Sequence, residues 1–383
     1  MSSGARFFFL QAAALALAIL FGALAGSVIL LAIGEDPLHI YPLMVRFNLG
    51  RIDSIAAIFY RATPLILAGL ATALAFRANL FNIGVEGQYY VGAVAAAFVG
   101  FAVGGLPRVV HLPLTILTGV LAGMLWALLP IVLKLRRGAH EVITTIMMNA
   151  IAGALVLYLL EPGLLRDPAQ AGTPRVRTPD ILPSALMPLL HPALTAIGLD
   201  IPGSSRLNWF LPVGMVLCIF FWWVLRRWRF GYEVRAVAHN PGAAEAAGIS
   251  TQRVQFLIFL LSGGVAGLVG LADTLAFFGY FDIDFPKGYG FLGISIALLA
   301  KNNPLGVVGA ALFIAFLDRG AQGVQVFAGA PREVITILQG LIILAIVVGY
   351  ELLTRYVRAQ RKREAQISPP LTAALAGTGE GRE

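Results

Sequence analysis

Three polar side chains interrupt the apolar stretch 79–92, where Asn82, Glu86 and Gln88 are separated by glycines. If this stretch lies in a membrane, a carboxylate at its middle costs about 3 kcal/mol, so Glu86 is expected to face protein or a wet cavity rather than lipid. Carboxylate and amide groups placed there can line a pathway for a polar solute or break a helix. Alternatively, Glu86 caps a helix start near the cytoplasmic face. The sequence leaves both interpretations open.

Asp273 is a second carboxylate inside an apolar segment, and together with Glu86 it could hold a proton or a cation. Aromatic side chains close to these carboxylates in sequence could stack on a flat ring of a solute. They are Tyr89, Tyr90, Phe277 and Phe278. Aromatic residues in membrane spans more often serve packing or interfacial anchoring, so stacking is the weaker interpretation.

A polar segment at 231–250 has a different character, because it contains both a helix start and a helix stop. Asn240 and Pro241 can begin a helix, the residues up to 247 are rich in alanine, and Gly248 can end it. A short surface helix between two spans is a feature that a partner protein can push against. An ordinary interhelical loop would usually be shorter and would lack both caps.

The sequence contains no catalytic signature. Each lysine follows a residue other than glycine, so there is no P-loop and the chain cannot itself be an ATPase. The five histidines are scattered, without the His-Glu-x-x-His arrangement, and no Gly-x-Ser-x-Gly motif occurs. The single cysteine, Cys218, lies in an apolar run and has no intrachain partner. These absences argue against an enzyme, a metal site and a bound cofactor.

The segments that carry these residues are long and apolar. Hydrophobic residues make up 58% of the chain and charged residues only 13%, whereas soluble domains carry about a quarter charged residues. Because lipid offers no partners to backbone groups, such segments must be helices, and the fold class is all-α. We expect about eight to ten transmembrane helices. The apolar segments are 7–33, 55–76, 83–104, 112–133, 142–160, 209–225, 255–281, 288–301, 305–318 and 334–353.

Basic residues gather where apolar segments end, at 134–137, 226–235 and 355–363, so orientation in a membrane explains the net charge of +8 better than nucleic acid does. All three clusters become cytoplasmic if the N-terminus is inside. The first apolar run is longer than a signal-peptide core and is interpreted as an anchor. We therefore expect a multi-pass protein of a bacterial inner membrane with both termini in the cytoplasm.

This orientation divides the chain into a transmembrane domain, 1–363, and a disordered cytoplasmic tail, 364–383. Within the domain, the Pro-rich stretch 161–208 forms a long external loop and 226–254 a cytoplasmic loop. The external loop contains four arginines, which is a mild objection to the orientation, although long loops weigh less in the positive-inside rule.

Two further patterns bear on the architecture. Lys301, Asn302, Asn303 and Pro304 separate two short apolar segments, so a broken or re-entrant element is expected there. Similarity between 64–104 and about 262–314, and between the helix starts at Glu141 and Glu333, suggests an inverted internal repeat. Chance similarity of short apolar words is the alternative. Glycine pairs spaced by four, at 263 and 267 and at 100 and 104, permit close helix packing.

Four stretches together resemble one family, the branched-chain amino acid, ribose and nucleoside class of bacterial ABC importer permeases. They are 80–88 (LFNIGVEGQ), 141–149 (EVITTIMMN), 235–249 (RAVAHNPGAAEAAGI) and 290–306 (GFLGISIALLAKNNPLG). The pattern is most similar to the longer permease of simple-sugar and nucleoside importers. Ala238 and Ala300 occupy positions where the family pattern has glycine. These two differences reduce the freedom of the local backbone and do not weaken the resemblance to the family.

The resemblance implies that 235–249 couples to a cytoplasmic ATPase and that 80–90 and 290–304 lie along the pathway. It also implies a second, related permease and an extracytoplasmic solute-binding protein as partners. The coupling candidates are Arg235, His239, Asn240, Pro241, Ala243, Ala244, Gly248 and Ile249. The candidates for the pathway or a helix break are Asn82, Glu86, Gln88, Tyr89, Tyr90, Asn149, Asp273, Asn302 and Asn303.

We therefore expect a permease subunit of an ABC importer that moves a small polar solute, a nucleoside or a simple sugar, with ATP hydrolysed on partner subunits. The alternative is a secondary transporter driven by an ion gradient through Glu86 and Asp273. A membrane enzyme or a scaffold is disfavoured because catalytic motifs are absent. The solute itself is not specified by the sequence, since a binding protein sets most of the specificity.

Overall fold

The computed structural model describes residues 20–328, apart from 29, 33, 171, 200 and 204, and isolated positions between 337 and 355. The chain divides into two compact units, Pro42–Phe327 and the combined terminal segments Met1–Tyr41 and Ala328–Glu383. Most of the predicted first and last spans, and all of the predicted tail, lie outside the described residues. The sites discussed below belong to the unit Pro42–Phe327.

The described residues are folded into helices joined by turns, with two isolated β-bridges, and the all-α prediction is confirmed. The helices are α2 (Pro37–Leu49), α3 (Ile52–Phe76), α4 (Val85–Ala102), α5 (Arg108–Arg137), α6 (Glu141–Leu159), α7 (His191–Ala196), α8 (Phe210–Arg227), α9 (Arg229–His239), α10 (Pro241–Ala246), α11 (Thr251–Val269), α12 (Tyr289–Leu299) and α13 (Pro304–Ala328). A short 3₁₀ helix, Pro168–Gln170, and a π-helical turn, Asp273–Phe278, complete the order.

Six helical segments in the described part are long and apolar enough to cross a membrane. They are α3, α5, α6, α8, the continuous segment Thr251–Phe278 and α13 up to Phe327. The helices α4 and α12 are not among them, because α4 begins with a polar turn and α12 has only 11 residues. The short α12 fits the expectation of a broken element before 301–304.

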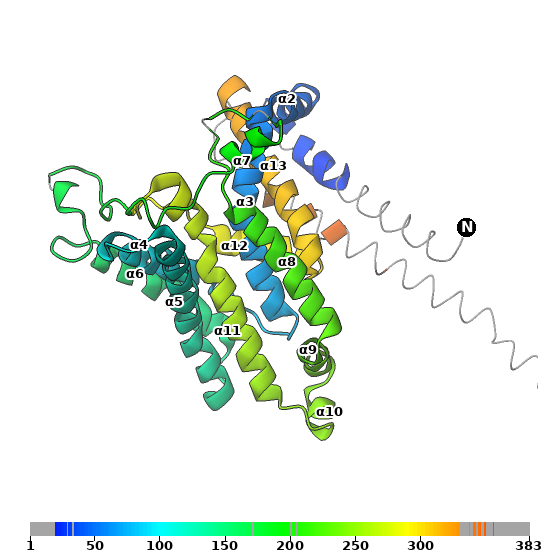
Figure 1. The fold of residues 1–383 in the computed structure, drawn as a ribbon. Helices are drawn as coiled ribbons and strands as arrows, with labels where there is room; N and C mark the ends of the chain where they lie inside the picture. The colour runs from blue at the N-terminus through cyan, green and yellow to red at the C-terminus, as the bar shows by residue number, and fades with distance from the viewer. Residues whose placement is uncertain are drawn as a thin grey trace, which may run out of the picture. The chain divides into compact units, whose positions relative to one another are not determined.

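The helix α11 is the central element of this unit and packs against α5, α3 and α4, while α12 packs against α3 and α4 (Figure 1). Glycines permit the contact between α5 and α11. A Cβ added to Gly267 would lie 2.1 Å from the carbonyl oxygen of Gly119, and one added to Gly123 would lie 2.4 Å from that of Gly263. The close packing predicted from 263 and 267 is confirmed, since the two backbones touch.

The loop 161–208, predicted to be external, packs against the ends of helices rather than extending freely. Thr178 N–H donates to Phe281 O at 2.9 Å, and Leu182 N–H donates to Gly100 O at 3.0 Å. A Cβ on Gly100 would meet Ile181 at 2.9 Å. Gly104 has nothing within 4 Å, so the prediction of close packing at 100 and 104 is wrong at Gly104, which lies beyond the end of α4 and faces open space.

Arg177 fixes this loop in place and balances part of its charge. Its guanidinium pairs with Asp180 and with Asp167, and lies 4.3 Å from the centre of the Tyr280 ring. The hydrogen bond to Asp180, followed by the attraction of both carboxylates, raises the pKa of Arg177 above its usual value. The basic side chain that weighed against an external loop is therefore neutralised locally.

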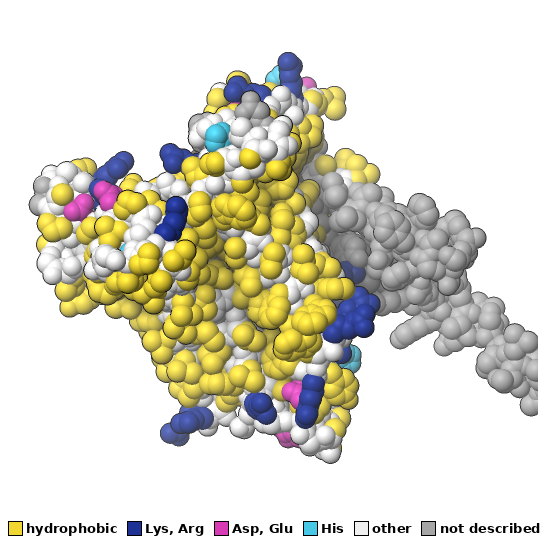
Figure 2. Space-filling view, viewed as in Figure 1, with side chains coloured by type: hydrophobic (Ala, Val, Ile, Leu, Met, Phe, Trp, Pro, Cys, Tyr) yellow, Lys and Arg dark blue, Asp and Glu magenta, His cyan; other side chains and the backbone are white. Residues whose placement is uncertain are grey.

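Contacts between distant segments define one end of the unit, here named the α10 end. Arg77 Nε donates to Asn302 O at 2.7 Å, and Asn79 Nδ2 donates to Ala238 O at 2.6 Å. The basic cluster at 134–137 lies at the same end, because Lys134 forms an ion pair with Glu141 and the Glu141 carboxylate accepts a hydrogen bond from Phe81 N–H. Figure 2 shows a largely apolar face with Lys and Arg near its lower edge, where α10 lies. Two of the predicted cytoplasmic clusters thus share one end.

Candidate functional site

The first turn of α4 meets the first turn of α12 through Glu86. Its carboxylate accepts hydrogen bonds from Gly288 N–H at 2.7 Å and from Gly290 N–H at 2.9 Å. The two helix starts are so close that a Cβ on Gly290 would lie 2.5 Å from Glu86 N. A carboxylate is favourable beside helix N-termini, where N–H groups lack partners and the helix dipole is positive. Glu86 therefore caps a helix start. The capped helix is α12, which is far in sequence from α4, the helix that contains Glu86.

The tyrosines beside Glu86 belong to the packed interior. The Tyr89 hydroxyl lies 3.0 Å from the Glu86 carboxylate and 2.9 Å from Pro286 O, and the Tyr90 hydroxyl donates to Phe285 O at 3.4 Å. The Tyr89, Tyr90 and Phe285 rings contact one another. Because Tyr89 is fully buried, it offers no free face on which a flat solute could stack.

A cavity of about 380 Å³ opens next to this junction, between α4, α6 and the segment before α12. Its polar lining consists of Glu86, Tyr90, Asn149 and Lys287. Asn149 is held in place, since its Oδ1 accepts from Gly87 N–H at 2.8 Å and its Nδ2 donates to Ile83 O at 2.9 Å. The cavity offers both hydrogen-bond acceptors and donors to a polar solute.

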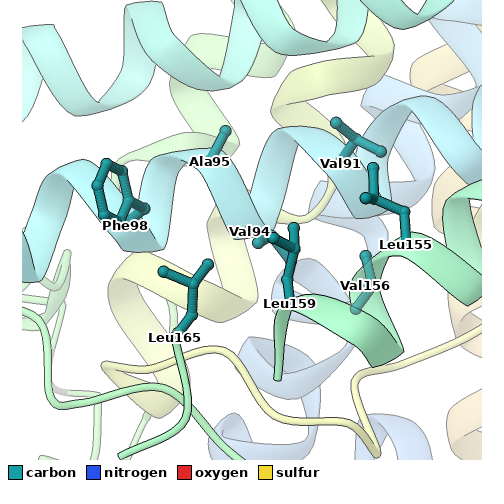
Figure 3. A pocket seen from close by; sticks show the side chains of 8 residues that line it. All are labelled: Val91, Val94, Ala95, Phe98, Leu155, Val156, Leu159 and Leu165. Atoms are coloured by element: carbon teal, nitrogen blue, oxygen red, sulfur yellow. The ribbon is translucent and has the colours of Figure 1, made fainter. Parts of the chain in front are cut away.

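An apolar cavity of about 310 Å³ adjoins the polar one along the same pair of helices. Figure 3 shows its lining, with Val91, Val94, Ala95 and Phe98 from α4 and with Leu155, Val156 and Leu159 from α6. Val156 also lines the polar cavity, so the two lie next to each other on the α4–α6 side.

The other two polar residues of the 79–92 stretch do not line the cavity. Asn82 and Gln88 bond to each other in both directions, at 2.9 and 3.0 Å, and Asn82 also donates to Ser262 Oγ at 2.8 Å. Ser262 donates to Ala71 O at 2.7 Å, and all three side chains are buried. The group is a closed network that attaches the start of α4 to α3 and α11.

Asp273 lies apart from the polar cavity. It begins the π-helical turn after α11, is 1% exposed and accepts a hydrogen bond from the Tyr60 hydroxyl. The Tyr60 ring stacks on the Phe277 ring, with 5.4 Å between the ring centres. The Arg206 guanidinium lies over the Phe277 ring, 5.2 Å from its centre. Asp273 therefore does not line the polar cavity, although Tyr289, which lies between the two glycines bound to Glu86, also bonds to it.

Asn302 and Asn303 form a turn at the α10 end. Lys301 and Asn302 have φ angles of 51° and 55°, which are unusual for residues with a side chain. Asn302 O accepts from Arg77, and Asn303 Oδ1 accepts from Leu305 N–H at 3.2 Å at the start of α13. These asparagines are turn and cap residues, and neither lines the polar cavity.

The coupling candidates lie on α9, on α10 and in the turn between α10 and α11. The short helix predicted at 241–247 is confirmed as α10, with Asn240 Oδ1 accepting from Ala243 N–H at 3.1 Å and Gly248 at φ 80°. His239, Pro241 and Ala243 are exposed, whereas Ala244 is 4% exposed. Arg235 donates to Leu225 O and so holds α9 to the end of α8. Gly248 is exposed and Ile249 half-buried.

A family model described as "branched-chain amino acid transport system / permease component" matches residues 54–347. The match covers more than half of the chain. The chain belongs to this family. Family membership makes it a multi-pass membrane component of a transport system rather than a catalytic enzyme, and it implies partners that hydrolyse ATP and bind the solute.

Three curated relatives agree with this assignment. A guanosine ABC transporter permease protein of Bacillus subtilis is 37% identical over 91% of this permease and 96% of its own length. A glucose ABC transporter permease protein of Haloferax volcanii is 37% identical over 86% and 85%. A nucleoside ABC transporter permease protein of Lactococcus lactis is 30% identical over 87% and 90%. The ABC permease prediction is confirmed, and nothing supports the ion-coupled alternative.

Among solved structures, an ABC transporter in an inward-facing conformation aligns with 91% of this permease and 99% of its own chain. The sequence identity is 18% and the TM-score 0.42, a likeness too distant to carry an argument.

Sequence reasoning missed the segment before α12, which supplies Lys287 and Gly288 to the site, whereas Gly290 belongs to the range 290–304 that the resemblance assigned to the pathway. A signal was present, since two glycines flank a tyrosine directly before an apolar run that is too short to span a membrane. Such a run suggests a helix that starts inside the membrane and needs a partner for its first N–H groups.

Proposed function

We propose that this permease carries a nucleoside or a simple sugar, and that the solute passes the polar cavity lined by Glu86, Asn149 and Lys287. The curated relatives named for guanosine, nucleosides and glucose support this class of solute. All of these solutes present several hydroxyl groups. A carboxylate, an amide and an ammonium around 380 Å³ can bond to hydroxyl groups, and Val156, Leu157 and Ile283 form an apolar part of the same lining.

The observation that carries the site is the convergence of two helix starts on Glu86. Discontinuous helices with starts inside the membrane are a recurrent design for solute sites, because their unpaired N–H groups replace water. Glu86 already occupies two of these N–H groups, so its carboxylate is held in one orientation toward the cavity. The solute then meets a fixed acceptor rather than a flexible one.

We further propose that a second, related permease covers the α6 side, so that the pathway lies between the two subunits. Several apolar side chains of α6, the helix that lines one side of the cavity, are exposed in the single chain. They include Ile143, Ile146, Met147 and Ile151. An interface there would complete the polar cavity on its open side.

The proposed topology places the α10 end in the cytoplasm of a bacterial cell, with 226–254 as the coupling loop, 161–208 outside and both termini inside. The domain 1–363 and the tail 364–383 follow the same proposal. The positive-inside rule supports it, because two basic clusters share the α10 end. Cys218 is buried, so an introduced cysteine can be labelled selectively. Ala243→Cys should react only from the cytoplasm and Ala193→Cys only from outside.

Uptake into proteoliposomes tests the function directly. The complex would be purified by a tag on this permease and reconstituted with its binding protein. ATP-dependent uptake of labelled guanosine or glucose is expected, and Glu86→Gln should lower it about tenfold, because one acceptor of charge-assisted bonds is lost. Arg136→Gln, an exposed change elsewhere, is the control. Uptake that follows an imposed ion gradient without ATP would overturn the proposal.

A further inference from the structure

A second polar cavity, of about 340 Å³, lies at the α10 end, and its charged residues are all basic. Arg77, Arg226 and Arg235 line it, together with Trp222 and Asn303. None of its lining residues is acidic. Within the described ranges, none of these arginines forms an ion pair. Three positive charges therefore converge on one cavity without a protein counter-charge.

Each guanidinium is held by a contact that leaves donors free. Arg77 uses Nε to donate to Asn302 O at 2.7 Å, and Arg235 uses Nη1 to donate to Leu225 O. Arg226 lies 5.4 Å from the centre of the Trp222 ring. Because a guanidinium has five N–H donors, most of the donors around the cavity are available to a ligand.

Helix ends explain part of this arrangement. Arg77 follows the last residue of α3 and Arg226 lies in the last turn of α8, where positive charge offsets the helix dipole. That explanation accounts for one arginine at each helix end, and not for three arginines facing one space. Burial, followed by repulsion from Arg235, lowers the pKa of Arg77. The cluster would gain stability from an anion.

The surroundings of the cavity favour a lipid as the source of that anion. Trp222 lines the cavity, the exposed Trp223 follows it in sequence, and the exposed Trp228 packs on Trp223, as is typical of residues at a membrane surface. The exposed side chains of α8 leading to this end are apolar, including Ile219 and Phe220, so acyl chains can lie along the helix. Basic pockets between spans near the cytoplasmic face suit lipid phosphates.

We propose that this cavity binds the phosphate group of an anionic membrane lipid, with its acyl chains along α8. Guanidinium groups suit phosphate because two parallel N–H bonds match two phosphate oxygens. Since Arg235 also fixes α9 to α8, lipid bound here would brace the helix that leads into the coupling loop. The site is separate from the polar cavity on the α4–α6 side and does not depend on the solute proposed above.

Native mass spectrometry of the tagged, full-length complex tests the proposal, with phosphatidylglycerol as the probe. Arg226→Gln is the main variant, because Arg226 is exposed and its loss does not threaten folding. We expect about fivefold weaker lipid retention, because this is the change in affinity that one basic residue near an anionic lipid contributes. Arg77→Gln combined with Arg226→Gln should weaken it further, and Arg226→Lys should restore part of it.

The matched control is Arg136→Gln with Arg137→Gln, two exposed arginines at the same end of the molecule but outside the cavity. It should keep lipid retention unchanged. An equal loss in the control, or no loss in Arg226→Gln, would overturn the proposal. So would displacement of the lipid by millimolar inorganic phosphate, which would assign the cavity to free phosphate. Loss of the lipid whenever the ATPase is bound would assign it to an acidic side chain of that partner.

Discussion

Two helix starts in this permease use the same chemistry in opposite surroundings. The start of α12 lies inside the protein, where Glu86 from another helix accepts its first N–H groups. The start of α10 lies at the surface, where the preceding Asn240 accepts from Ala243 N–H. The polar network beside Glu86, formed by Asn82, Gln88 and Ser262, is paired and buried, whereas around Asn240 most of the side chains are exposed.

The difference separates a scaffold from a contact surface. Inside the protein an unpaired polar group costs about 1–3 kcal/mol, so Asn82, Gln88 and Ser262 must form a closed network that fixes one geometry. At the surface water satisfies polar groups, and the shape of α10 is free to serve a partner. Changes at the two sites should therefore fail in different ways.

Asn82→Leu should have the largest effect. It removes both bonds that Gln88 makes with Asn82, in a fully buried place, at a cost of about 1–3 kcal/mol for each group left unpaired, while Ser262 keeps its bond to Ala71 O. We expect little folded protein in the membrane, measured by fluorescence-detected size exclusion. Thr118→Val on α5, whose hydroxyl bonds only to Leu114 of its own helix, is the control and should fold normally.

Ala243→Glu and Ala244→Glu should sharpen the contrast within α10. Ala243 is exposed, so its substitution should leave folding intact and abolish ATP-dependent uptake, because a bulky charge disturbs the surface that we propose meets the ATPase. Ala244 is buried, so its substitution should also lower the thermal stability. Normal uptake by Ala243→Glu, in an assembled complex, would refute the coupling role.

Gly290→Ala should open the junction between α4 and α12. The added Cβ would lie 2.5 Å from Glu86 N, so the helices must separate, at a cost of about 1–3 kcal/mol. We expect a clear fall in melting temperature and a larger fall in uptake. Gly309→Ala on α13 is the matched control, since nothing lies within 4 Å of its added Cβ. Equal effects of both changes would count against a junction built on close approach.

Asn240→Ala should have the smallest effect. Loss of a helix cap costs about 1 kcal/mol, which loosens α10 without changing its exposed surface. We expect ATPase activity stimulated by the solute to fall a few-fold, with the melting temperature almost unchanged. Asn240→Ser keeps a capping oxygen and should restore most of the activity. A failure of serine to do so would mean that Asn240 contacts the ATPase directly.

The apolar runs and caps predicted most elements, because lipid imposes a length and a composition on each span. The segment 142–160 corresponds to Glu141–Leu159, and 209–225 to Phe210–Arg227. The helix α9 was missed, although the buried Gly231, Val234 and Val237 repeat at helical spacing. That helix is short and polar overall, so hydropathy alone does not find it.

The site was predictable only in part. The sequence singled out Glu86 and Asn149, but not which side chains of the 79–92 stretch point to the cavity and which to the interior. Gln88 is only two positions from Glu86, yet it bonds to Asn82 while Glu86 bonds to residues about two hundred positions away. The packing of whole helices determines such partners, so a local sequence pattern does not predict them.

The glycine contact between α5 and α11 limits how the permease can change shape. With Gly267 against the Gly119 carbonyl, no side chain separates the two backbones, so neither helix can slide along the other without a collision. Because α11 packs against α3 and α4 as well as α5, the helices α3, α4, α5 and α11 must tilt together as one slab. In the transport that we propose, any alternation between outward and inward openings would take place at the borders of that slab, and the α6 side is one of them.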